Sequence, residues 1–335
     1  MKEHTIIIPR TLDLRAALKW ASNLFCSPNA DRYYIDFKEM EWVEPFSLLF
    51  LSSNIRRFKA MKPASEFLAK NFQRHSYAAH MGFFRTLNID FGNQPGEAKG
   101  SDTYLPITIL SIRELQKEAA QKAIHTGQFL EHHAMQLARL LTQEDASNLV
   151  DTLTYTLREI MRNAVEHSES DSFQYCGQYW QNRSTVQIAI LDSGIGVKQS
   201  LSNNPNLRII SDDQALRLSI LPGISGKPLS HKIEEYDDWG NSGYGLYLTK
   251  RLCTKGGSFF ICSGNKGLYS KANENEKYLS SNFQGTALRM ILDKNSTSAL
   301  KTALKQFRIE GEAIAKKFET GIPRASASSR GIKNQ

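Results

Sequence analysis

Glu159, Asn163 and His167 follow one another at intervals of four residues in the segment 149–168. Apolar residues recur there at three- and four-residue steps, which predicts an amphipathic helix. The four-residue interval places the three polar side chains on one strip of the helix surface. A carboxylate can accept a proton, and an amide oxygen can ligate a hard cation such as Mg²⁺. The strip is therefore either a chemical site or a solvated edge, although lysine and glutamate are more usual at a solvated edge.

A predicted strand at 185–191 leads directly into Asp192, Gly194 and Gly196. The strand is short, apolar and β-branched. An aspartate at the end of a strand can accept a hydrogen bond from a ligand, and glycine lets the backbone pass close to that ligand. Because turns account for most glycine pairs, this segment alone indicates only a loop.

A second glycine-bearing segment precedes a predicted helix at 246–254. Gly243 and Gly245 stand on either side of Tyr244, directly before Leu246. Backbone N–H groups at a helix N-terminus attract anions because they have no partner inside the helix. This segment predicts a seat for a phosphate group.

The three segments in this order resemble the ATP-binding domain shared by gyrase B subunits, large heat-shock chaperones, MutL mismatch-repair proteins, histidine kinases and anti-sigma-factor serine kinases, a superfamily known as GHKL. The resemblance covers about residues 140–295 and rests on the patterns Glu-x-x-x-Asn, Asp-x-Gly-x-Gly and Gly-x-x-Gly-x-Gly-Leu. The layout is most similar to that of anti-sigma-factor serine kinases and histidine-kinase-like ATPases. It implies an α/β fold, a two-layer α+β sandwich in which helices lie on a mixed β-sheet and hold ATP under a mobile lid.

The resemblance also implies a role for each matching residue. Glu159 would be the catalytic base, and Asn163 would ligate Mg²⁺ beside the ATP phosphates. Asp192 would accept a hydrogen bond from the adenine amino group, with Thr286 near the same ring. His167 is either a nucleotide contact or a buried structural histidine. The other residues implied to contact the nucleotide are Gly194, Gly196, Gly243, Tyr244, Gly245 and Leu246.

Residues 197–239 lie between the two glycine-bearing segments and show no clear periodicity. A loop of this length is usually functional, and the resemblance implies that it is the lid. Lys227 within it would either reach a phosphate or be an ordinary exposed lysine.

Residues 1–100 predict a separate small α/β domain, because predicted strands alternate with predicted helices. The segment 34–58 resembles the strand–turn–helix of STAS domains, the fold of anti-sigma-factor antagonists; a generic α/β module is the alternative. In STAS domains a phosphoacceptor serine follows an aspartate just before the helix. Glu44 and Pro45 stand at those positions here, with Ser47 further in, so regulated phosphorylation at this place is not expected.

Four further segments complete the predicted organisation. We expect a connecting helical segment at 101–145, the ATP-binding domain at 146–295, a C-terminal helix at 296–320 and a disordered basic tail at 321–335.

The composition of the chain, 41% hydrophobic and 23% charged, is typical of a globular protein, and its 335 residues are enough for two domains. No run of eighteen apolar residues and no signal-like N-terminus is present, so we expect a cytoplasmic protein without a membrane partner. The net charge of +8 comes from scattered residues, so nucleic acid is not an expected partner. The four cysteines have neither metal-ligand nor disulfide spacing.

Three functions remain open. The first is an ATP- and Mg²⁺-dependent ATPase-type regulatory module, in which nucleotide state controls contacts with the N-terminal domain, a protein partner or a second copy. The second is a protein serine kinase resembling the anti-sigma-factor kinases. The third is a module that binds ATP without hydrolysing it.

Overall fold

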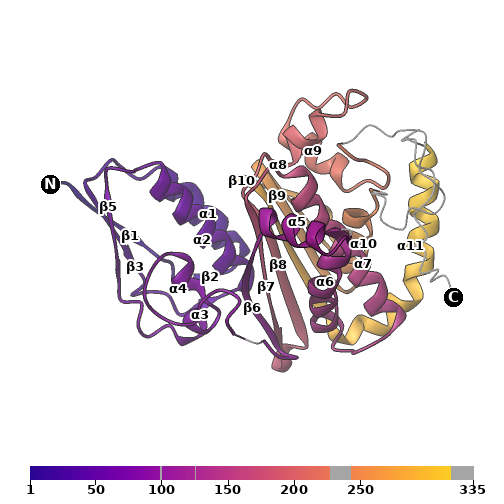
Figure 1. The fold of residues 1–335 in the computed structure, drawn as a ribbon, viewed down its shortest axis with the longest axis horizontal. Coiled ribbons are helices and arrows are strands. Elements are labelled where there is room, and N and C mark those ends of the chain that lie inside the picture. The colour runs from indigo at the N-terminus through magenta and orange to yellow at the C-terminus, as the bar shows by residue number, and fades with distance from the viewer. Residues whose placement is uncertain (99, 125, 227–242, 318–335) are drawn as a thin grey trace.

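The computed structural model describes residues 1–98, 100–124, 126–226 and 243–317 (Figure 1). The fold is mixed α/β. A three-stranded parallel sheet with helices comes first in the chain, and a five-stranded antiparallel sheet packed against helices follows. The predicted α/β fold class is confirmed.

The N-terminal part alternates strands and helices, as predicted. Its elements are β1 (Glu3–Ile7), β2 (Thr11–Leu12), α1 (Leu14–Phe25), β3 (Arg32–Asp36), β4 (Trp42–Val43), α2 (Pro45–Ala60), β5 (Glu66–Lys70), α3 (Ser76–His80) and α4 (Phe83–Thr86). The larger sheet has the order β1-β3-β5, and β2 pairs with β4; all of these pairs are parallel. Ser47 of α2 is fully buried, and its hydroxyl donates to the carbonyl oxygen of Asp13 at 3.3 Å.

The second part of the chain builds the larger sheet. Its elements are β6 (Tyr104–Ser111), α5 (Ile112–Gln121), α6 (Thr126–Thr142), α7 (Asn148–His167), β7 (Ser172–Trp180), η1 (Gln181–Arg183), β8 (Thr185–Asp192), α8 (Gly196–Ser202), α9 (Asp212–Ser219), α10 (Gly245–Gly256), β9 (Gly257–Lys271), β10 (Lys277–Asp293), η2 (Lys294–Ser296) and α11 (Thr297–Lys317). The strand order is β6-β7-β8-β10-β9. Neighbouring strands are all antiparallel, whereas the resemblance implied a mixed sheet. Short connections between β7 and β8 and between β9 and β10 reverse the chain directly.

The predicted helix around the polar strip is observed as α7. Ser147 caps it by accepting a hydrogen bond from the N–H of Val150 at 3.2 Å. Its apolar residues, among them Leu153, Leu157 and Met161, are buried in the core that the helices share with the five-stranded sheet. The apolar stripe of α7 therefore fixes the direction of the polar strip beside it.

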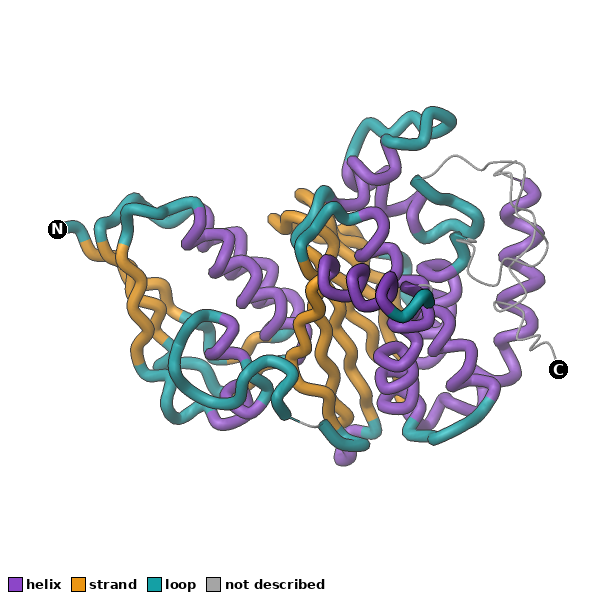
Figure 2. Tube along the Cα trace, viewed as in Figure 1, coloured by secondary structure: helices purple, strands orange, loops and turns teal. Residues whose placement is uncertain are grey.

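Both faces of the five-stranded sheet are covered. Ile188 and Ile190 of β8 belong to the core on the α7 side, whereas Ala189 and Leu191 belong to the core that also holds α1 and α2. This alternation follows from the strand, in which successive side chains point to opposite faces. Figure 2 shows the sheet between the two sets of helices. The N-terminal part thus forms a third layer on the sheet, which the sequence did not predict.

Two segments differ from their predictions. Residues 101–145, expected as a helical connection, supply β6 to the sheet edge and α6 to the core beside α7. Residues 197–226, expected as part of an irregular lid, contain α8 and α9, whose Leu201 and Leu216 are buried in that core. These two helices are short, and their apolar residues are buried by contacts with each other and with β9 and β10.

Other predictions concern the remainder of the chain. The C-terminal helix predicted at 296–320 is observed as α11. Lys227, the rest of the expected lid to residue 239, and the tail at 321–335 lie outside the described residues.

Candidate functional site

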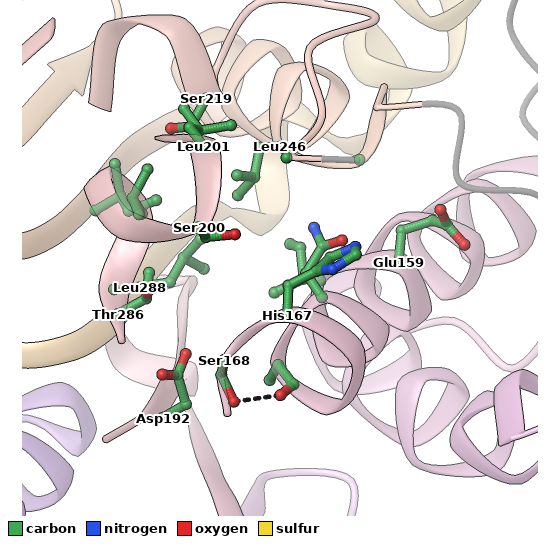
Figure 3. A pocket seen from close by; sticks show the side chains of 18 of the residues that line it. Glu159, His167, Ser168, Asp192, Ser200, Leu201, Ser219, Leu246, Thr286 and Leu288 are labelled. Atoms are coloured by element: carbon green, nitrogen blue, oxygen red, sulfur yellow. Dashed lines mark hydrogen bonds between the residues drawn. The ribbon is translucent and has the colours of Figure 1, made fainter. Parts of the chain in front are cut away.

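A pocket on the α7 side of the five-stranded sheet brings together segments that are far apart in the sequence (Figure 3). Its walls come from α7, the end of β8, α8, the start of α10 and β10. Figure 3 shows Asp192 and Thr286 at one end of the pocket and Glu159 at the other. The predicted site residues that line it are Glu159, Asn163, His167, Asp192, Gly196, Gly243, Gly245, Leu246 and Thr286.

The polar strip of α7 forms one wall of this pocket. Glu159 is only 2% exposed, and Asn163 and His167 are half-buried. The strip is therefore not a solvated edge. His167 lies beside Glu166, with 3.9 Å between its Nε2 and a carboxylate oxygen, so it is both largely buried and part of the pocket wall.

Asp192, the last residue of β8, places a buried carboxylate at the opposite end. Its Oδ1 accepts a hydrogen bond from the N–H of Gly194 at 3.0 Å, and Thr286 donates to the Asp192 carboxylate from both its backbone N–H and its hydroxyl. Thr286 is adjacent because the two residues pair in the ladder between β8 and β10. Burial raises the pKa of Asp192 to about 6, and the hydrogen bonds oppose that rise.

Gly194 packs the loop after β8 against the end of α7 and does not itself line the pocket. A Cβ at this position would lie 1.8 Å from the carbonyl oxygen of Ser168. The same carbonyl accepts a hydrogen bond from the N–H of Ile195 at 2.7 Å. The predicted close approach at Gly194 is therefore made to the protein's own helix, and it keeps Asp192 beside α7.

Gly245 begins α10 and lies against Glu159. A Cβ on Gly245 would approach the Cβ of Glu159 to 2.9 Å, so only glycine lets the two helices meet this closely. Gly243, Gly245 and Leu246 line the pocket at this point. The N–H groups of a helix start thereby lie next to the polar strip, where an anion can bind.

Tyr244 is a predicted site residue that does not line the pocket. Its side chain is fully buried, and its ring centroid lies 6.4 Å from that of Tyr247. Gly311 of α11 packs against both rings. Burial raises the pKa of Tyr244, and Glu312 adds to the rise. The side chain thus anchors the start of α10 to α11, and its expected contact with nucleotide stays a prediction.

The apolar lining of the pocket is the part that sequence reasoning missed. Ile190 comes from the strand predicted at 185–191 and Leu288 from β10, and alternation along these strands puts both side chains on the α7 side. Ser200 and Ser219 come from α8 and α9, which the sequence did not predict. The other apolar lining residues include Val197, Leu201, Ile224 and Ile261. An apolar wall beside a buried carboxylate suits a planar ring that donates a hydrogen bond.

A magnesium ion would find few protein ligands here. Among the described residues, no group of three or more His, Cys, Asp or Glu side chains could hold a metal ion. Asn163 offers an amide oxygen in the pocket wall. Mg²⁺ typically takes only one or two protein oxygens together with waters and substrate phosphates, so this donor set fits a phosphate-bound Mg²⁺.

Comparisons with known proteins provide little further information on this site. No family model and no curated protein matches the chain. Among solved structures, a crystal structure of the N-terminal domain of a DNA repair protein aligns with 40% of this chain and 34% of that chain, at 16% identity and a TM-score of 0.18. The matched part is about a third of that structure's length, and a TM-score this low supports no conclusion about fold or function. Within the described residues, no helix is both long enough and apolar enough to cross a membrane.

Proposed function

We propose that the pocket binds ATP together with Mg²⁺ and that the protein is an ATP-dependent enzyme of the GHKL type. One observation carries the proposal: the three sequence segments that resemble GHKL motifs, separated along the chain, line a single pocket with Thr286. Three unrelated segments that resembled these motifs only by chance would have no reason to line the same pocket.

Each end of the pocket has chemistry that fits one end of ATP. The carboxylate of Asp192 would accept a hydrogen bond from the adenine amino group, with the apolar wall against the faces of the ring. The helix start at Gly243 and Gly245 would bind phosphate oxygens. Asn163 would hold Mg²⁺, which when bound offsets the charge of the phosphates.

Glu159 would accept the proton of the attacking group near the γ-phosphate. Figure 3 shows its carboxylate directed away from the end of the pocket that Asp192 and Thr286 form. The terminal phosphate would lie on the Glu159 side, opposite the adenine. With water as the attacking group the reaction is hydrolysis; with a serine hydroxyl it is phosphoryl transfer to a protein. Ser47, the serine nearest to the STAS phosphoacceptor position, is fully buried and is not a candidate acceptor.

The test is single-turnover incubation with γ-labelled ATP and Mg²⁺, with and without cell lysate. Wild type, Glu159→Gln and Asn163→Ala are compared, and ATP affinity is measured separately. We expect labelled phosphate from wild type, a loss on the order of 100-fold in Glu159→Gln, and weakened Mg²⁺-dependent binding in Asn163→Ala.

The outcomes separate the candidate functions. Free phosphate indicates an ATPase, whereas label on a protein that disappears with Glu159→Gln indicates a kinase. ATP binding without either product leaves only a binding module. Unchanged Mg-ATP affinity in Asn163→Ala would overturn the placement of the site.

A further inference from the structure

Glu159 is flanked on α7 by two arginines that are themselves buried, Arg158 and Arg162. Arg162 is only 1% exposed and is one of the largest fully buried side chains in the described part of the chain. Taking a guanidinium out of water is costly unless carboxylates and hydrogen bonds compensate for it. A helix that only had to pack on the sheet would carry an apolar residue at this position. The buried arginine therefore indicates a role other than packing.

The contacts of Arg162 run to two carboxylates. Its Nη2 donates to Oε2 of Glu159 at 3.0 Å, and its Nε lies 3.4 Å from Oε1 of Glu166. These partners are three residues before it and four residues after it, so they lie along the same side of α7. Because a guanidinium is planar and rigid, a contact on each side fixes its plane and thereby the direction of the Glu159 carboxylate.

Arg158 makes a longer contact with the same carboxylate. Its Nη2 lies 3.8 Å from Oε1 of Glu159, and its Nη1 lies 3.7 Å from Glu131 of α6. Arg162 is therefore the arginine within hydrogen-bond distance of Glu159. Neither arginine lines the pocket, whereas Glu159 does.

We propose that Arg162 is a positioning residue that holds the carboxylate of Glu159 in the orientation from which it accepts a proton. The proposal rests on the proposed ATP site, because that site gives Glu159 a reaction to serve. Since Arg162 does not line the pocket, it acts through Glu159 and not on the nucleotide. After the attacking group and the base Glu159, Arg162 would be the third member of the site, and its role would be to orient the base, as a neighbouring side chain does in other catalytic sites.

The experiment compares Arg162→Gln, Arg162→Lys, Glu159→Gln and the double variant Glu159→Gln/Arg162→Gln in the full-length chain. ATP affinity and the single-turnover rate are measured for each. We expect Arg162→Gln to slow turnover by about 10-fold or more while ATP affinity stays within about 3-fold. Arg162→Lys should restore part of the rate, and the double variant should be no slower than Glu159→Gln alone.

Arg289→Gln is the matched control. Arg289 forms a buried pair with Glu44 on the opposite face of the same sheet, with 2.8 Å between Nη2 and Oε2. We expect Arg289→Gln to lower the thermal unfolding midpoint as Arg162→Gln does, but to leave the turnover rate unchanged. If Arg289→Gln slows turnover equally, the role of Arg162 is only structural and the proposal fails.

Other outcomes are equally decisive. An unchanged rate in Arg162→Gln overturns the proposal. A double variant slower than Glu159→Gln shows that Arg162 acts on the nucleotide directly and also overturns it. ATP bound by wild type without any turnover removes the role of both Glu159 and Arg162 but leaves adenine recognition standing. No ATP binding by wild type overturns the proposed function itself.

Discussion

Asp192 is a buried residue whose charge should control ligand binding. Burial raises its pKa to about 6, so the carboxylate is mostly ionised at pH 7.5 and mostly protonated at pH 5. An ionised carboxylate accepts hydrogen bonds at both oxygens, whereas the protonated form is a poorer acceptor for an amino group. We expect ATP affinity, measured by calorimetry, to be constant above about pH 7 and to fall several-fold as pH drops to about 5.

Asp192→Asn provides the control for this titration, because an amide does not ionise in this range. The variant should bind ATP about 10-fold or more weakly at pH 7.5, from the loss of a charged hydrogen bond. Its remaining affinity should change less between about pH 7 and pH 5 than that of wild type, because only the titration of the terminal phosphate is left. An equally large pH dependence in the variant would assign the titration to another group.

The elements that hold the site differed in how well the sequence predicted them. α7, β8 and α10 were predicted because periodicity and flanking glycines are local features of the chain. β6 was not predicted, because it contains Pro106 and its partner strand β7 is far away in the sequence. The pairing of the two strands also shifts register between Leu105 and Thr108. Proline lacks the N–H that a ladder needs, so it is tolerated there because β6 is an edge strand.

The contact between the end of α7 and the loop after β8 leads to a prediction at the scale of elements. In Gly194→Ala the new Cβ meets the carbonyl of Ser168, which is backbone and cannot swing away. The loop must move off α7, and Asp192 should move with it. We expect lower thermal stability together with ATP affinity reduced about 10-fold or more, because the proposed adenine contact depends on this geometry.

Gly96→Ala separates this effect from the general consequence of replacing a glycine. Gly96 has a φ of +77°, and a Cβ there would meet nothing within 4 Å. Its replacement should cost about 1 kcal/mol of stability through backbone strain and leave ATP affinity unchanged. If both variants bind ATP normally, the Gly194 contact does not position the site.

Across the whole molecule, α2 joins the N-terminal part to the sheet that carries the site. The helix is buried along most of its length, and it contacts β7, β8 and β10. Its Phe46 N–H donates to Oε1 of Gln187 at 3.1 Å, and Ser53 shares a hydrogen bond of 3.2 Å with Ser193, next to Asp192. The sequence predicted the two parts but not this packing, because α2 lacks one clear apolar stripe and the contacts join residues that are far apart in the chain.

The buried pair between Glu44 and Arg289 tests whether the two parts fold as one unit. Arg289 of β10 donates two hydrogen bonds, at 3.0 and 2.9 Å, to the carboxylate of Glu44, the residue directly before α2. Glu44→Gln would leave the guanidinium buried without its countercharge, which should lower the free energy of unfolding by about 3–5 kcal/mol. The exposed pair of Arg10 and Glu41 is the control, and Glu41→Gln should change stability by less than about 1 kcal/mol.

Because one continuous core holds α1, α2 and the sheet face beneath them, Glu44→Gln should lower a single unfolding transition followed by calorimetry. Residues 1–98 and the sheet would then lose structure together, and ATP, which we propose binds on the other face, should raise the midpoint of that same transition. Two transitions, with only the earlier one sensitive to Glu44→Gln and only the later one sensitive to ATP, would show instead that the N-terminal part is an independent domain resting on the sheet.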